Sequence, residues 1–292
     1  MFESFATHDI GVTDATIHCR IGGRGPPLLL LHGCPQSHVM WHKIVPALTQ
    51  HYTVIASDLR GYGDSSKPRG LPDHSNYSFR TMALDQVALM ASLGFNSFSA
   101  VGHDRGARVL HRMALDYPDT VARAALLDIL PTAFMYAQTD RDFATSYWEW
   151  FFFIQGGDFP EQMLSGNPEG FLRYEIGHLV DQGVIPPEAW REYLRVLSSR
   201  DAMHGMCEDY RAGASIDLEH DVADAGRKVL CPLMALWGNR NPIWQRFDML
   251  EVWREHAESV VGCGIDAGHY LAEEAPEAVL VNLLLFLDGG AA

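Results

Sequence analysis

Short apolar runs alternate along this chain with segments whose apolar residues recur at helical spacing. The segments at 39–50, 79–93, 105–117, 242–257 and 275–287 have this helical pattern. The intervening apolar runs lie at 15–22, 27–32, 53–57, 97–101, 123–128, 231–237 and 259–265. Continuous apolar strands that alternate with amphipathic helices are typical of a parallel sheet covered on both faces. We therefore predict an α/β fold with a mostly parallel central sheet flanked by helices.

The alternation stops between residues 132 and 225. This stretch contains no strong strand pattern, but it carries an aromatic cluster at 147–153 and helix-like segments at 187–200 and 201–213. We predict a helical cap inserted into the α/β domain. The expected organisation is a first core segment at 1–131, the cap at 132–225 and a second core segment at 226–292.

Composition narrows the possible partners. The 292 residues are 47% hydrophobic and 20% charged, which is typical of a soluble globular protein, and the formal net charge is −15 with a pI near 5.3. A chain this acidic is not expected to bind nucleic acid or an anionic membrane. The N-terminus lacks the pattern of a signal peptide, and no apolar run approaches the length of a membrane span. We expect a cytoplasmic protein.

The five cysteines are scattered and have no CxxC spacing. They are expected to be reduced packing residues, as buried free cysteines commonly are. No motif predicts a metal site or a cofactor. The cysteines are Cys19, Cys34, Cys207, Cys231 and Cys263.

A candidate nucleophile follows the apolar run at 97–101. Gly102-His103-Asp104-Arg105-Gly106 stands between this strand and a helix, which matches the nucleophile elbow of α/β hydrolases with Asp in place of Ser. A carboxylate suits displacement at a saturated carbon that bears a halide or an epoxide oxygen, because the product is an alkyl ester of the enzyme. Asp104 is therefore predicted to be the nucleophile.

A histidine after the last strand and an acid after the sixth are predicted to complete the catalytic set. His269 stands on the loop after 259–265, where this fold carries the base that activates water. The loop after the seventh strand, 236–242, contains no acid, so Asp128 is expected to orient the histidine. The backbone N–H groups of Cys34 and Arg105 are expected to form the oxyanion hole.

Several longer segments carry a family resemblance that extends over nearly the whole chain. They are His32-Gly33-Cys34-Pro35-Gln36, Asp58-Leu59-Arg60-Gly61-Tyr62-Gly63-Asp64-Ser65, His103-Asp104-Arg105-Gly106-Ala107-Arg108, Tyr147-Trp148-Glu149-Trp150 and Cys207-Glu208-Asp209-Tyr210-Arg211-Ala212. The first two are widespread among α/β hydrolases and epoxide hydrolases, whereas the others are more specific. Together they resemble the haloacetate (fluoroacetate) dehalogenases of the α/β-hydrolase fold.

The resemblance implies a substrate carboxylate held by Arg105 and Arg108, and it also implies a homodimer. It further implies a halide pocket that includes Trp150 and Tyr210. The remaining pocket position, a histidine in the family, is Glu149 here. An ionised carboxylate would repel a departing fluoride, while a protonated one can donate a single hydrogen bond. Chloride or bromide is therefore expected to leave more readily than fluoride.

Three functions remain open at this stage. The first is hydrolytic dehalogenation of a short 2-haloacid, with an ester on Asp104 that His269-activated water hydrolyses. The second is hydrolysis of an epoxide, including an epoxy acid with Glu149 as proton donor, through the same ester. The third is an inactive α/β hydrolase used as a binding module, which intact Asp104, Asp128 and His269 disfavour.

Overall fold

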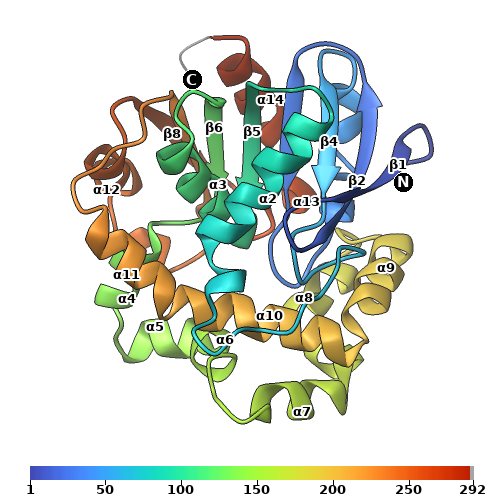
Figure 1. Ribbon diagram of the computed structural model, residues 1–292, viewed down its shortest axis with the longest axis vertical. Coiled ribbons are helices and arrows are strands. Elements are labelled where there is room, and N and C mark those ends of the chain that lie inside the picture. The colour runs from blue at the N-terminus through green and yellow to red at the C-terminus, as the bar shows by residue number, and fades with distance from the viewer. Residues whose placement is uncertain (290–292) are drawn as a thin grey trace.

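One eight-stranded sheet forms the centre of the protein in a computed structural model, which describes residues 1–289 (Figure 1). The strand order is β1-β2-β4-β3-β5-β6-β7-β8, in which β2 is antiparallel to both of its neighbours, β1 and β4, and all other pairs are parallel. The strands are β1 Ala6–Gly11, β2 Thr16–Gly23, β3 Pro27–Leu31, β4 Thr53–Ser57, β5 Phe98–His103, β6 Val121–Leu127, β7 Leu233–Gly238 and β8 Val260–Ile265. The predicted α/β fold with a mostly parallel sheet is confirmed.

The predicted apolar runs form buried strands, because helices cover both faces of the sheet. Leu28, Leu29, Leu30 and Leu31 of β3 have no exposed surface. Strand β1 was not predicted, since it lies at the sheet edge and its residues are almost all exposed. An edge strand with both faces near water needs no apolar run, so hydrophobic patterning does not reveal it.

Helices α2 and α3 lie in front of the sheet and α14 lies behind it in Figure 1. The helices around the sheet are α1 Val45–Leu48, α2 Phe79–Ser92, α3 Arg105–Asp116, α12 Met249–His256, α13 Leu271–Glu274 and α14 Pro276–Leu287. Three short 3-10 helices accompany them, at His38–Trp41, Ser75–Tyr77 and Trp244–Arg246.

Two predicted helices are each divided in two. The segment 39–50 forms a 3-10 turn followed by α1, which has proline in its first turn, a position that needs no N–H donor. The segment 242–257 divides at Asp248, whose side chain accepts a hydrogen bond from the Glu251 N–H and begins α12.

Eight helices occupy the chain between β6 and β7, and they lie below the sheet in Figure 1. They are α4 Thr132–Ala137, α5 Arg141–Ser146, α6 Trp148–Phe152, α7 Phe159–Ser165, α8 Pro168–Asp181, α9 Pro187–Leu197, α10 Arg200–Gly213 and α11 Ile216–Ala223.

The last three residues of the predicted segment 226–292 lie outside the described residues. No helix within residues 1–289 is both long and apolar enough to span a bilayer.

Candidate active site

Asp104 occupies a strained turn between β5 and α3. Its backbone has φ 47° and ψ −117°, which is rare for a residue with a side chain. The turn is tight enough to require glycine beside it. A Cβ on Gly102 would lie 2.6 Å from the backbone of α3, and one on Gly106 would lie 2.4 Å from the His32 carbonyl oxygen. These close approaches hold the Asp104 carboxylate at the end of the sheet.

The loop after β3 supplies a hydrogen bond to this carboxylate. The Cys34 N–H donates to Oδ2 of Asp104 over 2.9 Å. The Arg105 N–H belongs to the first residue of α3, and N–H groups in a first helical turn have no partner within their helix. The Cys34 N–H thus meets the Asp104 carboxylate, and the Arg105 N–H follows Asp104 directly in the chain. Their role as an oxyanion hole stays a prediction.

The structure brings His269 and Asp128 together. The Nδ1 of His269 donates to Oδ2 of Asp128 over 2.5 Å, and Oδ1 of Asp128 accepts from Gly238 N–H and Trp244 Nε1 at 2.7 Å and 2.8 Å. Burial lowers the pKa of His269, but the hydrogen bond and charge of Asp128, with the charge of Asp104, raise it overall to about 9. Asp128 thus sets the tautomer and orientation of the His269 ring. The other oxygen of Asp128 is held in place by its hydrogen bonds from Gly238 and Trp244.

His103 is a further residue of this region that the sequence did not predict. Its Nε2 lies 2.8 Å from the His269 carbonyl oxygen and must donate to it. Burial is the main reason that the pKa of His103 falls to about 3, so the ring is neutral. The contact joins the elbow to the loop that carries His269.

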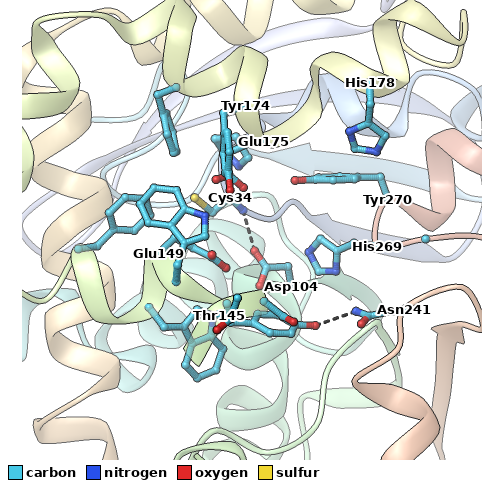
Figure 2. A pocket seen from close by; sticks show the side chains of 18 of the residues that line it. Cys34, Asp104, Thr145, Glu149, Tyr174, Glu175, His178, Asn241, His269 and Tyr270 are labelled. Carbon is cyan, nitrogen blue, oxygen red and sulfur yellow. Dashed lines mark hydrogen bonds between the residues drawn. The ribbon is translucent and has the colours of Figure 1, made fainter. Parts of the chain in front are cut away.

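A cavity of about 530 Å³ opens above Asp104 (Figure 2). The sheet side contributes Cys34, Asp104 and His269, and helices α5, α6, α8 and α10 contribute the opposite walls. This volume lies within the range of small-molecule sites and is much larger than a haloacetate requires. The aromatic lining residues are Tyr147, Trp148, Trp150, Phe153, Phe171, Tyr174, Tyr210 and Tyr270.

Two glutamates line this cavity with Asp104. Glu149 comes from α6 and Glu175 from α8, and Figure 2 shows both carboxyl groups pointing into the cavity near Asp104. Burial raises the pKa of Glu149 to about 8, and the charge of Glu175 adds to this effect. Burial likewise raises the pKa of Glu175 to about 7.

Glu175 was missed in the sequence, although a signal for it exists. It stands next to Ile176 and four residues after Phe171, both of which are buried residues of α8. A glutamate on the apolar side of a helix is unusual, because carboxyl groups are rarely buried without a partner. The helix itself was not predicted, so this position could not be assigned to a face.

Arg105 and Arg108 make contacts within the protein. Arg105 donates to both carboxylate oxygens of Asp209, at 2.8 Å from Nε and 2.5 Å from Nη2. Arg108 donates from Nη1 to the Leu130 carbonyl and to Thr132 Oγ1, at 3.0 Å and 2.9 Å. Neither guanidinium is part of the cavity lining. Their role in holding a substrate carboxylate stays a prediction.

The two aromatic residues predicted for the halide pocket separate these arginines from the cavity. Arg108 lies 4.6 Å from the ring centre of Trp150, and Arg105 lies 4.2 Å from that of Tyr210. Both rings line the cavity together with Glu149. The three residues predicted to surround the leaving group thus share one cavity, and each aromatic ring has a cation behind it.

Within residues 1–289, two clusters of possible metal ligands lie outside the cavity. His18, His38 and Asp58 form one, but Oδ1 of Asp58 already accepts hydrogen bonds from the N–H and ring of His38. The other contains Glu161, whose Oε1 is bound 2.6 Å from Arg211.

Comparison with known proteins assigns the family. The model of the alpha/beta hydrolase fold matches residues 26–276, which is most of the chain. The chain belongs to the α/β-hydrolase family. Within this family it is similar to the haloacetate dehalogenases, as its motifs indicate.

Three relatives illustrate the range of similar α/β hydrolases. A fluoroacetate dehalogenase from a Burkholderia species is 45% identical, over 99% of this chain and 95% of its own. A soluble epoxide hydrolase from Corynebacterium sp. (strain C12) is 33% identical, over 98% of both chains. The crystal structure of an α/β hydrolase from Nostoc sp. PCC 7120 superposes with a TM-score of 0.97 at 50% identity, over 99% of this chain and all of that one.

Proposed function

We propose that this α/β hydrolase removes halide from short 2-haloacids and releases the 2-hydroxy acid. The observation that carries the proposal is the Asp104 carboxylate in the elbow, facing a cavity and accompanied by the His269–Asp128 pair. A carboxylate nucleophile favours a saturated carbon over an ester carbonyl. The similarity to a fluoroacetate dehalogenase supports the same reaction class.

In the first step, one Asp104 oxygen attacks the α-carbon, and the carbon–halogen bond breaks with its electron pair going to the halide. The Cys34 N–H then lies beside the ester carbonyl oxygen. Esterification removes the negative charge of Asp104, which is one cause of the high pKa of His269. The reaction itself therefore makes the histidine a better proton donor and shifts it towards the neutral form that activates water.

In the second step, water loses a proton to Nε2 of His269 and attacks the ester carbonyl carbon. The anionic oxygen receives hydrogen bonds from the backbone N–H groups of Cys34 and Arg105. The C–O bond to the enzyme carbonyl then breaks, His269 gives its proton to the departing alkoxide oxygen, and the 2-hydroxy acid leaves with the oxygen that came from Asp104. The second water proton remains on the new Asp104 carboxyl group and is released to solvent, which balances the halide set free in the first step. Asp128 holds the imidazolium throughout this step.

The charges near the cavity favour Arg108 over Arg105 as the main attraction for a substrate carboxylate. The charge of Arg105 is matched by Asp209, whereas Arg108 donates only to neutral oxygens. Arg108 lies behind the Trp150 ring, and its positive charge offsets part of the negative charge of Asp104 in the cavity. The helices at 132–225 act in this proposal as a cap that keeps water from the reacting carbon.

Epoxide hydrolysis is the second candidate, and Glu149 is the observation that favours it. A carboxylic acid held protonated by burial can supply the proton that an opening epoxide oxygen requires. The similarity to a soluble epoxide hydrolase agrees with this reaction. An epoxy acid would combine this proton donor with the positive charge of Arg108 behind the Trp150 ring.

The test measures halide release from bromoacetate, chloroacetate and fluoroacetate beside the opening of oxirane-2-carboxylate. We expect bromoacetate and chloroacetate to react faster than fluoroacetate, because fluoride needs the strongest hydrogen-bond donors as it leaves. Asp104→Asn is the control and should abolish every reaction. Opening of the epoxide without release of any halide would overturn the dehalogenase proposal in favour of the second candidate. Absence of both reactions would support a binding module.

A further inference from the structure

Glu175 reaches the cavity from α8, which also lines it with Phe171, Tyr174 and His178. Its Oε1 is buried and has no hydrogen-bond partner in the described part of the chain. Leaving a buried polar oxygen without a partner costs about 1–3 kcal/mol, so such an oxygen in a cavity commonly serves a ligand. The other wall presents Glu149, and both carboxyl groups approach the same space above Asp104 (Figure 2).

We propose that Glu175 is a catalytic residue and that it shares protons with Glu149, so that the pair presents an O–H group to the leaving atom opposite Asp104. This inference rests on the proposed function, because it concerns the departing halide or epoxide oxygen. It adds a residue from α8 to the leaving-group pocket and assigns the two glutamates one joint role.

Electrostatics support a shared proton. Two carboxylates in a water-poor cavity repel each other, and burial disfavours the ionised form of both. The negative charge of Asp104 also faces them and raises both pKa values. Such a pair titrates as one unit, and it keeps a proton at a pH where an exposed glutamate has lost it.

The proton has a different fate with each leaving group. Hydrogen halides are stronger acids than this pair, so the proton stays on the glutamate and only donates a hydrogen bond to the halide. An alkoxide is a far stronger base, so the proton moves to the epoxide oxygen and becomes part of the product hydroxyl. During ester hydrolysis water supplies two protons. His269 passes one to the departing alkoxide oxygen, and the other, left on the new Asp104 carboxyl group, restores the pair, so the net reaction adds one water.

Other titratable groups also face the pair and must be separated from it. The cavity contains Asp104, His178, His269 and Glu274, of which His269 has its pKa raised to about 9. Burial holds the pKa values of Tyr147, Tyr210 and Tyr270 well above the ordinary range of tyrosine, so their hydroxyls stay protonated. Tyr174 also lines the cavity. His269 is thus the main competing cause of a pH dependence.

The test measures bromide binding to the free enzyme as a function of pH, by quenching of tryptophan fluorescence. Wild-type affinity should fall at least about tenfold once the pair ionises, which corresponds to a shift of one pKa unit. In Glu175→Gln, the remaining Glu149 loses its charged neighbour, and the midpoint of this fall should move to lower pH. Glu149→Gln should shift the midpoint in the same direction, because Glu175 also loses a carboxyl neighbour.

The double variant Glu149→Gln/Glu175→Gln should keep only the dependence that belongs to His269. Glu169→Gln is the matched control, since this exposed glutamate lies on the same helix as Glu175. If the two glutamates had only a structural role, their replacement would weaken bromide binding equally at all pH values. An unchanged midpoint in both single variants would overturn the proposal.

Infrared spectra of the wild type minus the double variant isolate the pair from other carboxyl groups, including buried Glu273, whose pKa is also raised to about 8. At neutral pH this difference should contain a protonated-carboxyl band that disappears as the pH is raised, and absence of the band would also overturn the proposal. Both measurements use free enzyme without substrate. A failure of the dehalogenase proposal would therefore appear as absent turnover, while the titration of the pair would remain.

Discussion

Asp209 neutralises Arg105 at the centre of the protein. Its two carboxylate oxygens accept from Nε and Nη2 of Arg105, and its Oδ2 also accepts from the Tyr62 hydroxyl over 2.6 Å. Asp209 is fully buried and Arg105 is 1% exposed. The residue after Asp104 is therefore bound to α10, a helix distant in sequence, and this contact connects the elbow to the helices between β6 and β7.

Asp209→Asn is expected to destabilise the fold by about 3–5 kcal/mol, because the Arg105 charge would remain buried without its partner. Urea unfolding of wild type and variant measures this difference. Asp142→Asn is the control, since its ion pair with Arg141 is largely exposed and should contribute far less to stability. Equal stability of the two variants would show that the Arg105–Asp209 pair does not hold α10 to the core.

His269→Gln should stop the reaction after the first step, because glutamine cannot take the proton from water. Incubation with chloroacetate should then add one carboxymethyl group to Asp104, which intact-protein and peptide mass spectrometry detect. In wild type, a single turnover in ¹⁸O water should place the label in the Asp104 carboxylate. Label found only in the product would instead indicate direct attack of water on the substrate.

Asp128→Asn should lower kcat by about 10⁴-fold, as the corresponding change does in serine-type triads. The amide donates towards His269 and so disfavours the required tautomer. It also removes the hydrogen bond and charge that raise the pKa of His269 to about 9, so NMR titration of the ring should show a lower value. Asp248→Asn, which keeps its hydrogen-bonding side chain at the start of α12, should leave both measurements unchanged.

Gly106→Ala should disrupt the elbow. The new Cβ would lie 2.4 Å from the His32 carbonyl oxygen, so the loop after β3 or helix α3 would have to move, at a cost of at least about 2 kcal/mol. Gly11→Ala is the matched control, because nothing lies within 4 Å of the added atom, and its effect should stay below about 0.5 kcal/mol. Thermal unfolding followed by circular dichroism measures both. Similar melting temperatures would contradict this account of the turn.

Much of the sheet and the elbow was predictable because their signals are local. A buried parallel strand needs a continuous apolar run, and β3, β4 and β7 each have one. The glycines around Asp104 stand in a fixed spacing, since helix and strand backbones approach too closely for a side chain. The helices between β6 and β7 were harder to predict from the sequence, because many are too short to show a clear helical repeat. Their apolar residues also contact several different neighbours instead of facing one sheet.

The sequence by itself therefore determined the α/β fold and the position of Asp104, and it indicated Asp128 and His269 as its partners. Only the tertiary structure decided what the charged residues around them can do. It placed Asp209 on Arg105, 104 residues away in the chain, and it placed Glu175 in the same cavity as Glu149. The reason is that the chemistry of an ionisable side chain depends on burial and on the charges within a few ångströms, which local sequence patterns do not encode.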